Sequence, residues 1–100
     1  MIKVINPVIK TLSFPCRPQN MIDFISEVIR HQAIIKLNYQ DGHTIRYSYK
    51  DLLWDTSNPE YPLVIQGEGS FSIYGYEASH PETWLGPHRL VLIEIVNGWV

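Results

Sequence analysis

The stretch that decides the fold is residues 34–50, IIKLNYQDGHTIRYSYK. Apolar and polar residues alternate at a period of two on both sides of Asp41-Gly42, which is the pattern of half-buried strands. Asp-Gly between two such runs indicates a hairpin, because both central residues of a type I′ turn need positive φ. The stretch therefore predicts a β-hairpin over residues 34–50.

Before the hairpin, the hydrophobic period is helical. One apolar stripe recurs at spacings of three and four, formed by Met21, Phe24, Ile25, Val28 and Ile29, as on the buried face of a helix. Asn20 suits the N-cap, and Asp23 places a carboxylate near the positive helix end. We expect a helix over residues 20–33.

The remaining segments read as short extended pieces. Residues 1–19 predict an extended arm or edge strand, because Pro7 cannot donate to a ladder and the prolines at 15 and 18 disfavour a helix there. Further strands are expected at residues 63–65, 71–78 and 89–96, with a turn at 67–70 and a polar loop at 79–88. Gly75 predicts a bulge or bend inside the strand 71–78.

These elements predict one α+β domain over residues 1–100. The N-terminal helix would pack on an antiparallel sheet formed by residues 34–100. That sheet would be strongly bent, or would form a partly open SH3-like or Sm-like barrel of five to six strands. A parallel sheet is excluded because each crossover would need its own helix.

Composition narrows the class of partner and the location. The formal net charge is -2, whereas nucleic-acid binders usually carry excess Lys and Arg, so nucleic acid is a possible partner but not the first expectation. The single cysteine, Cys16, excludes an intramolecular disulfide. No apolar run approaches the roughly 18 residues of a membrane span, and residues 1–7 do not resemble a signal peptide. We expect a cytoplasmic protein with no membrane partner.

The chemistry-bearing residues give no catalytic or metal signature. The four histidines, His31, His43, His80 and His88, lack a paired ligand spacing. Cys16 lies beside Arg17, which would favour a thiolate, but no local motif surrounds it, and a packed cysteine is the simpler interpretation. We expect no enzyme activity, no cofactor and no metal.

Aromatic residues supply the candidate site. On a strand, Tyr74 and Tyr76 would share one face, opposite Phe71 and Ile73. A solvent-facing tyrosine pair beside Arg46 or Arg89 would stack a base or planar ligand, or form the centre of a protein interface. Alternatively, the aromatics cover the ends of a small barrel. The candidate binding residues are Tyr74, Tyr76, Arg46, Arg89 and, in the loop 79–88, Trp84.

The order of elements resembles the WYL domain, a small Sm-like or SH3-like barrel. The resemblance rests on Ile35 to Tyr39, Pro62-Leu63-Val64-Ile65, Phe71 to Glu77 and Arg89-Leu90, and it spans roughly residues 22–96. The naming tripeptide Trp-Tyr-Leu of the family corresponds to Phe71-Ser72-Ile73 in this chain. The resemblance implies a regulatory module that senses a ligand or a nucleic acid.

The sequence as a whole favours a non-enzymatic binding or regulatory module that acts through a protein partner or through self-association as a homo-oligomer. The alternative is a WYL-like or Sm-like domain that senses a nucleic acid or nucleotide.

Overall fold

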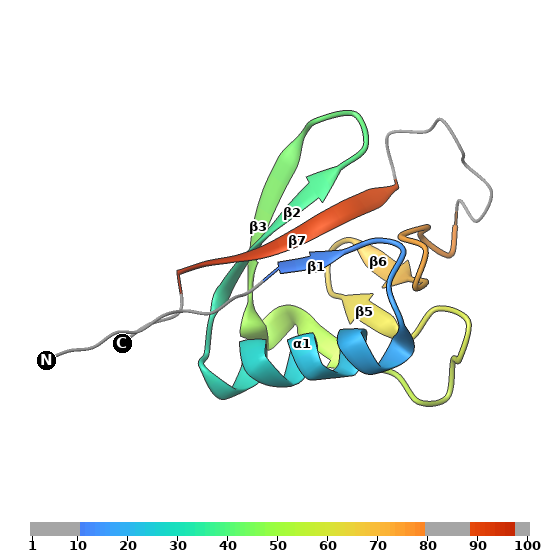
Figure 1. Cartoon of the computed structure of the whole chain (residues 1–100), viewed down its shortest axis with the longest axis horizontal. Helices are drawn as coiled ribbons and strands as arrows, with labels where there is room; N and C mark the ends of the chain where they lie inside the picture. The colour runs from blue at the N-terminus through green and yellow to red at the C-terminus, as the bar shows by residue number, and fades with distance from the viewer. Residues whose placement is uncertain (1–10, 80–88, 98–100) are drawn as a thin grey trace, which may run out of the picture.

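The structure is a computed structural model that describes residues 11–79 and 89–97. It contains one α-helix and two antiparallel sheets (Figure 1), which confirms the predicted α+β class. Of the helices in the described ranges, none combines the length and the apolar character that crossing a membrane requires.

The helix α1 runs from Pro18 to Arg30, with Arg17 rather than Asn20 at the N-cap. It begins two residues before the expected start at 20 and ends three residues before the expected limit at 33. The prediction that proline would exclude a helix at 18 was wrong, because the first helical turn tolerates proline and its fixed φ. The end is set by Gln32, which has a φ of 51°, and by a hydrogen bond from Ala33 N–H to Val28 O (2.9 Å).

The helix buries a narrower stripe than its sequence suggested. Met21, Phe24, Ile25 and Val28 are buried, whereas Ile29 is 45% exposed. Ile29 therefore does not belong to the core-facing surface.

The hairpin is confirmed, with a different turn. It consists of β2 (Ile34–Tyr39) and β3 (Thr44–Ser48), and the alternation of β2 buries Ile35, Leu37 and Tyr39. Only Gly42 in the turn has positive φ, and its N–H donates to Tyr39 O. This is the pattern of a three-residue loop closed by a left-handed glycine, not of a type I′ turn.

The larger sheet has the order β1-β7-β2-β3 and is antiparallel throughout. The short strand β1 (Thr11–Ser13) lies at one edge, which agrees with the predicted edge strand; residues 1–10, including Pro7, are outside the described residues. The strand β7 (Leu90–Asn97) occupies the place expected for the strand at 89–96.

The smaller sheet has the order β4-β5-β6. A 3-10 turn, η1 (Tyr49–Asp51), leads into β4 (Leu52–Trp54), and β5 is Leu63–Ile65, as predicted. The last strand, β6 (Gly69–Phe71), is shorter than expected and starts inside the predicted turn at 67–70. The chain then turns instead of continuing as a strand to residue 78.

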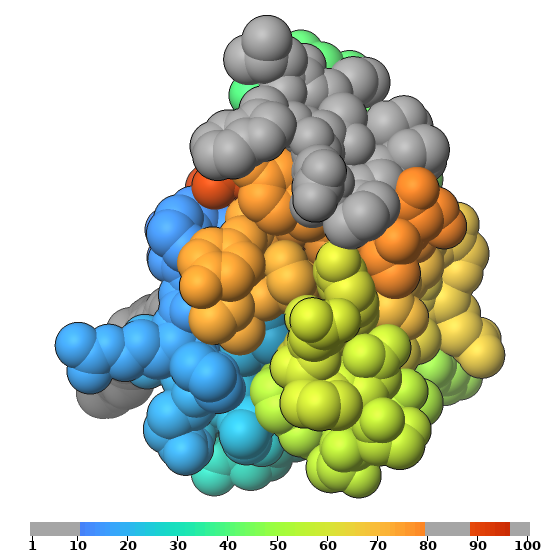
Figure 2. Space-filling view, turned by 90° about the vertical axis from the view of Figure 1, so that its right-hand side faces the viewer, coloured from blue at the N-terminus to red at the C-terminus, as the bar shows by residue number. Residues whose placement is uncertain are grey.

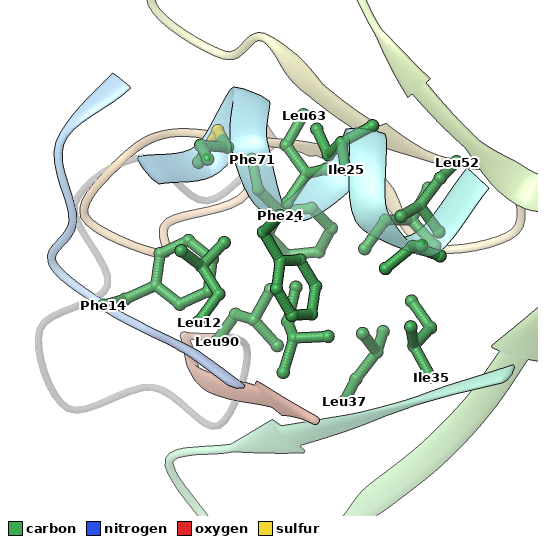
Figure 3. Packing of buried hydrophobic residues seen from close by; sticks show 14 of the residues in the cluster. Leu12, Phe14, Phe24, Ile25, Ile35, Leu37, Leu52, Leu63, Phe71 and Leu90 are labelled. Atoms are coloured by element: carbon green, nitrogen blue, oxygen red, sulfur yellow. The ribbon is translucent and has the colours of Figure 1, made fainter. Parts of the chain in front are cut away.

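The core lies between the helix and the two sheets. The helix contacts both β1 and β4, and Figure 3 shows side chains of α1 and of both sheets pointing toward one another. The described strands do not close into a barrel, and they number seven rather than five to six. The predicted change of period holds, because after residue 40 the described residues contain no helix longer than η1.

Candidate functional site

A tight turn at residues 72–76 presents Tyr74 to solvent. Ser72 N–H donates to Tyr76 O, and Gly75 N–H donates to Ser72 O, both at 2.9 Å. The Ser72 hydroxyl, itself buried, accepts from the N–H groups of Tyr74 (3.2 Å) and Tyr76 (3.3 Å). We call residues 72–76 the Tyr74 turn. Its hydrogen bonds fix the backbone that carries the Tyr74 side chain, which is 55% exposed.

Gly75 ties this turn to β7. Its φ is 90°, and a Cβ at this position would lie 2.0 Å from Leu90 O. Leu90 N–H donates to Gly75 O at 2.8 Å. Only glycine combines the left-handed backbone with this close approach, so the predicted bend at Gly75 is present, as part of a turn rather than of a strand.

Arg89, the residue immediately before β7, completes the arrangement. Its Nε donates to Tyr74 O at 3.1 Å, and its guanidinium carbon lies 5.3 Å from the centroid of the Tyr76 ring, within the range of a cation–π contact. We call Tyr74, Tyr76 and Arg89 the aromatic–arginine cluster. Its two contacts hold the planar Arg89 cation next to the backbone that carries the exposed Tyr74 side chain.

Three of the five candidate residues thus come together, for a reason other than the expected one. The expected strand face that Tyr74 and Tyr76 would share with Ser72 is absent, because the chain turns at that point. Arg46 lies apart, on the exposed edge strand β3 of the larger sheet. Trp84 is outside the described residues.

An apolar pocket of about 410 Å³ adjoins the Tyr74 turn through Ile73. Figure 2 shows this face, where the orange segment of the turn meets the yellow-green segment after β4 and the blue segment at the helix start. The pocket is lined by the start of the helix, the loop after β4 and the Tyr74 turn: Pro18, Trp54, Asp55, Thr56, Pro59, Pro62 and Ile73. Proline and tryptophan give it stiff, apolar walls.

A polar centre that the sequence did not predict lies between the hairpin and Glu68. The hydroxyls of Tyr39 and Tyr47 both donate to the Glu68 carboxylate, the second at 2.7 Å. The hairpin is thereby joined to the turn before β6. The sequence does indicate that Tyr39 and Tyr47 face the same side, because alternation places residues 35, 37 and 39 on the same side of the hairpin as 45 and 47. No local pattern identified Glu68 as the acceptor of the two tyrosines.

This centre keeps its tyrosines protonated. Burial raises the pKa of Tyr39 well above its ordinary range, and the hydrogen bond to Glu68 adds to the rise. The same hydrogen bond, followed by burial, raises the pKa of Tyr47 to about 12. Both phenols therefore act as hydrogen-bond donors near neutral pH.

Cys16 borders a groove of about 570 Å³ between β1 and α1. Burial raises the pKa of its thiol to about 11, so the effect expected from the neighbouring Arg17 does not dominate. Nucleophilic cysteines have lowered pKa values. The thiol at this position is therefore poorly suited to attack.

The two described histidines have local partners. His43 lies flat on the Tyr39 ring, with centroids 4.5 Å apart, and its Nδ1 contacts Asp41. His31 Nε2 lies 3.1 Å from Glu27 Oε1. His80 and His88 fall outside the described residues, and within those residues no three His, Cys, Asp or Glu side chains form a potential metal site.

Comparison with known proteins gives no match: no family model fits the chain, no curated protein matches its sequence, and no solved structure matches its fold.

Proposed function

We propose that this domain is a non-enzymatic binding module that recognises a protein partner through the aromatic–arginine cluster and the adjoining apolar pocket. The observation that carries the proposal is the combination of a 55% exposed Tyr74 with a turn fixed by hydrogen bonds. An exposed aromatic side chain on a rigid backbone loses little conformational entropy on binding.

The composition of the surface supports a protein partner. Tyrosine, tryptophan and arginine are the residue types that dominate interface energetics. Here Trp54 lines the same pocket as Ile73 of the Tyr74 turn, and Arg89 donates to Tyr74 O of that turn. Arg89 uses its Nε for Tyr74 O, which leaves the outer nitrogens for an acidic group of the partner. The partner segment would insert an apolar side chain into the pocket beside Ile73.

The test is a quantitative affinity purification from the source cells with four versions of the full chain: the wild type, Tyr74→Ala, Arg89→Ala and Ile29→Ala. Ile29 is a matched control because it is 45% exposed but lies 11 residues from Pro18 along α1. We expect a specific protein that the wild type and Ile29→Ala retain equally.

Binding of that purified protein is then measured by calorimetry. Tyr74→Ala and Arg89→Ala should each weaken it by about 30-fold, as for a hot-spot residue. Equal affinity of all four versions would contradict the proposal.

A second candidate function is binding of single-stranded nucleic acid, favoured by the exposed Tyr74 side chain and by the Arg89 cation, which contacts Tyr74 O and lies over the Tyr76 ring. This second candidate includes the proposal that the chain is related to the WYL domain and forms a partly open SH3-like or Sm-like barrel. The order of helix, hairpin and later strands supports it. Fluorescence titration with a short single-stranded RNA should then show binding that weakens steeply with salt and is lost in Tyr74→Ala. A flat titration at low ionic strength would reject it.

A further inference from the structure

The outer edge of β3 presents open backbone hydrogen-bonding groups. β3 is the last strand of its sheet (Figure 1), and at the start of its ladder Tyr39 N–H donates to His43 O. Because hydrogen-bonded and non-hydrogen-bonded pairs alternate in an antiparallel ladder, the N–H and C=O groups of Thr44 and Arg46 point away from β2. Within the described residues these groups have no hydrogen-bond partner on that side.

The ends of this open edge are defined. Toward the C-terminal end, Ser48 N–H is taken by the Asp51 carboxylate (3.3 Å) of η1. Toward the other end, the chain enters the loop closed by Gly42. The free edge is therefore short, and it fits one brief extended segment.

The side chains of the edge offer one apolar and one cationic contact. Ile45 is 37% exposed and faces the same side as the buried Leu37, its cross-strand partner. Arg46 is exposed on the opposite face of the sheet. A strand added here would contact Ile45 with one side chain and Arg46 with the next, because side chains alternate.

The charges across the sheet indicate the chemistry of the missing neighbour. The register aligns Glu94, Lys36 and Arg46 in one row across β7, β2 and β3. Lys36 Nζ lies 3.9 Å from Glu94 Oε1, so Glu94 pairs with Lys36. Arg46 therefore has the positive charge of Lys36 directly opposite it on β2. Like charges directly opposite each other are destabilising, and opposite charges are favourable. A carboxylate on a further strand would complete the row.

We propose that the edge of β3 binds an extended segment of a partner protein, which pairs antiparallel to β3 with an acidic side chain opposite Arg46 and an apolar side chain against Ile45. This surface is separate from the aromatic–arginine cluster. The proposal therefore stands independently of the function proposed above.

A second copy of the chain fits the edge poorly. If two β3 strands paired antiparallel around Arg46, the two arginines would lie directly opposite each other. If they paired around Ile45, the arginines would be diagonal neighbours, roughly 7–8 Å apart. Each register brings like charges together and supplies no carboxylate, so charge complementarity favours an acidic partner over self-association.

The test uses synthetic extended peptides and the full chain. The probe is a nine-residue peptide of alternating Thr and Val with a central Glu, and its binding is followed by backbone amide shifts and hydrogen exchange. We expect the amides of Thr44 and Arg46 to shift and become protected. Replacing the central Glu by Lys should weaken binding about fivefold, the upper range for an exposed ion pair, and N-methylation of the peptide amides that face β3 should abolish binding.

The charge reversal Arg46→Glu provides the decisive variant. It should reverse the preference, so that the Lys peptide binds about fivefold better than the Glu peptide, whereas Arg17→Glu, at an exposed arginine before α1, should leave the preference unchanged. Equal binding of both peptides, amide shifts confined to other elements, or dimerisation through β3 in sedimentation experiments would overturn the proposal. Tyr74→Ala should have no effect.

Discussion

Arg89 stacks over the Tyr76 ring, with 5.3 Å between its guanidinium carbon and the ring centroid. The same guanidinium donates from Nε to Tyr74 O, so the arginine is held by two residues of one turn. A side chain with this many rotatable bonds would otherwise lose much entropy on binding. The two contacts therefore hold the Arg89 cation in place before a partner binds.

Two glycines of similar φ should respond very differently to the same substitution. Gly75→Ala would combine backbone strain with a Cβ 2.0 Å from Leu90 O, and we expect a loss of about 3–4 kcal/mol in the free energy of unfolding. Gly42→Ala meets nothing within 4 Å and should lose only about 1–2 kcal/mol. Urea denaturation of both variants measures the difference, and equal losses would show that the close packing at Gly75 is absent.

The Glu68 carboxylate should contribute strongly to stability. Glu68→Ala leaves the hydroxyls of Tyr39 and Tyr47 without their acceptor, and we expect a cost of about 2–3 kcal/mol. Glu60→Ala, at an exposed loop carboxylate, should change stability by less than about 0.5 kcal/mol. Thermal unfolding of the two variants is the measurement. Similar midpoints would mean that the tyrosine pair does not depend on Glu68.

Stability should fall in alkaline solution because of the same tyrosines. The pKa of Tyr47 is raised from 10.0 to about 12 in the folded state, so between these pH values the unfolded chain releases its proton while the folded chain keeps it. The free energy of unfolding therefore decreases as pH rises through this window. Denaturation at several alkaline pH values measures the slope, and it should be smaller in Glu68→Ala. A flat profile above pH 10 would contradict the raised pKa.

Cys16 should react slowly in the folded protein. Burial raises the pKa of its thiol from 9.0 to about 11, which at about pH 8 lowers the thiolate fraction roughly 100-fold. Alkylation by iodoacetamide, followed by mass spectrometry, should be slower than for the same chain in denaturant by at least this factor. Comparable rates in the two states would show that the thiol is not shielded.

The parts of the fold that the sequence predicted correctly are those with a local cause. The alternation in β2 and the stripe of α1 arise from residues close in sequence, so periodicity alone identified them. The prediction of a strand over 71–78 was wrong because a contact between residues distant in sequence determines the structure there. Gly75 has to approach Leu90 O, a residue 15 positions away, and alternation cannot report a turn fixed by such a distant contact.

The candidate site shows the same division. Tyr74 and Tyr76 were selected from composition, but their contact with Arg89 depends on the Tyr74 turn docking on β7. Arg46 has the right residue type, yet the register of the hairpin places it at the far edge of the larger sheet. Glu68 was missed because its two tyrosine donors come from different strands.

Site-specific photocrosslinking at position 74 tests the proposed binding face most directly. A photoreactive benzoylphenylalanine replaces Tyr74 in one version of the full chain and Ile29, exposed to 45%, in another, and both are irradiated in the source cells. We predict one discrete covalent adduct with a protein from position 74, absent from position 29 and lost when Arg89→Ala is added. The same adducts from both positions, or none from position 74, would contradict the account.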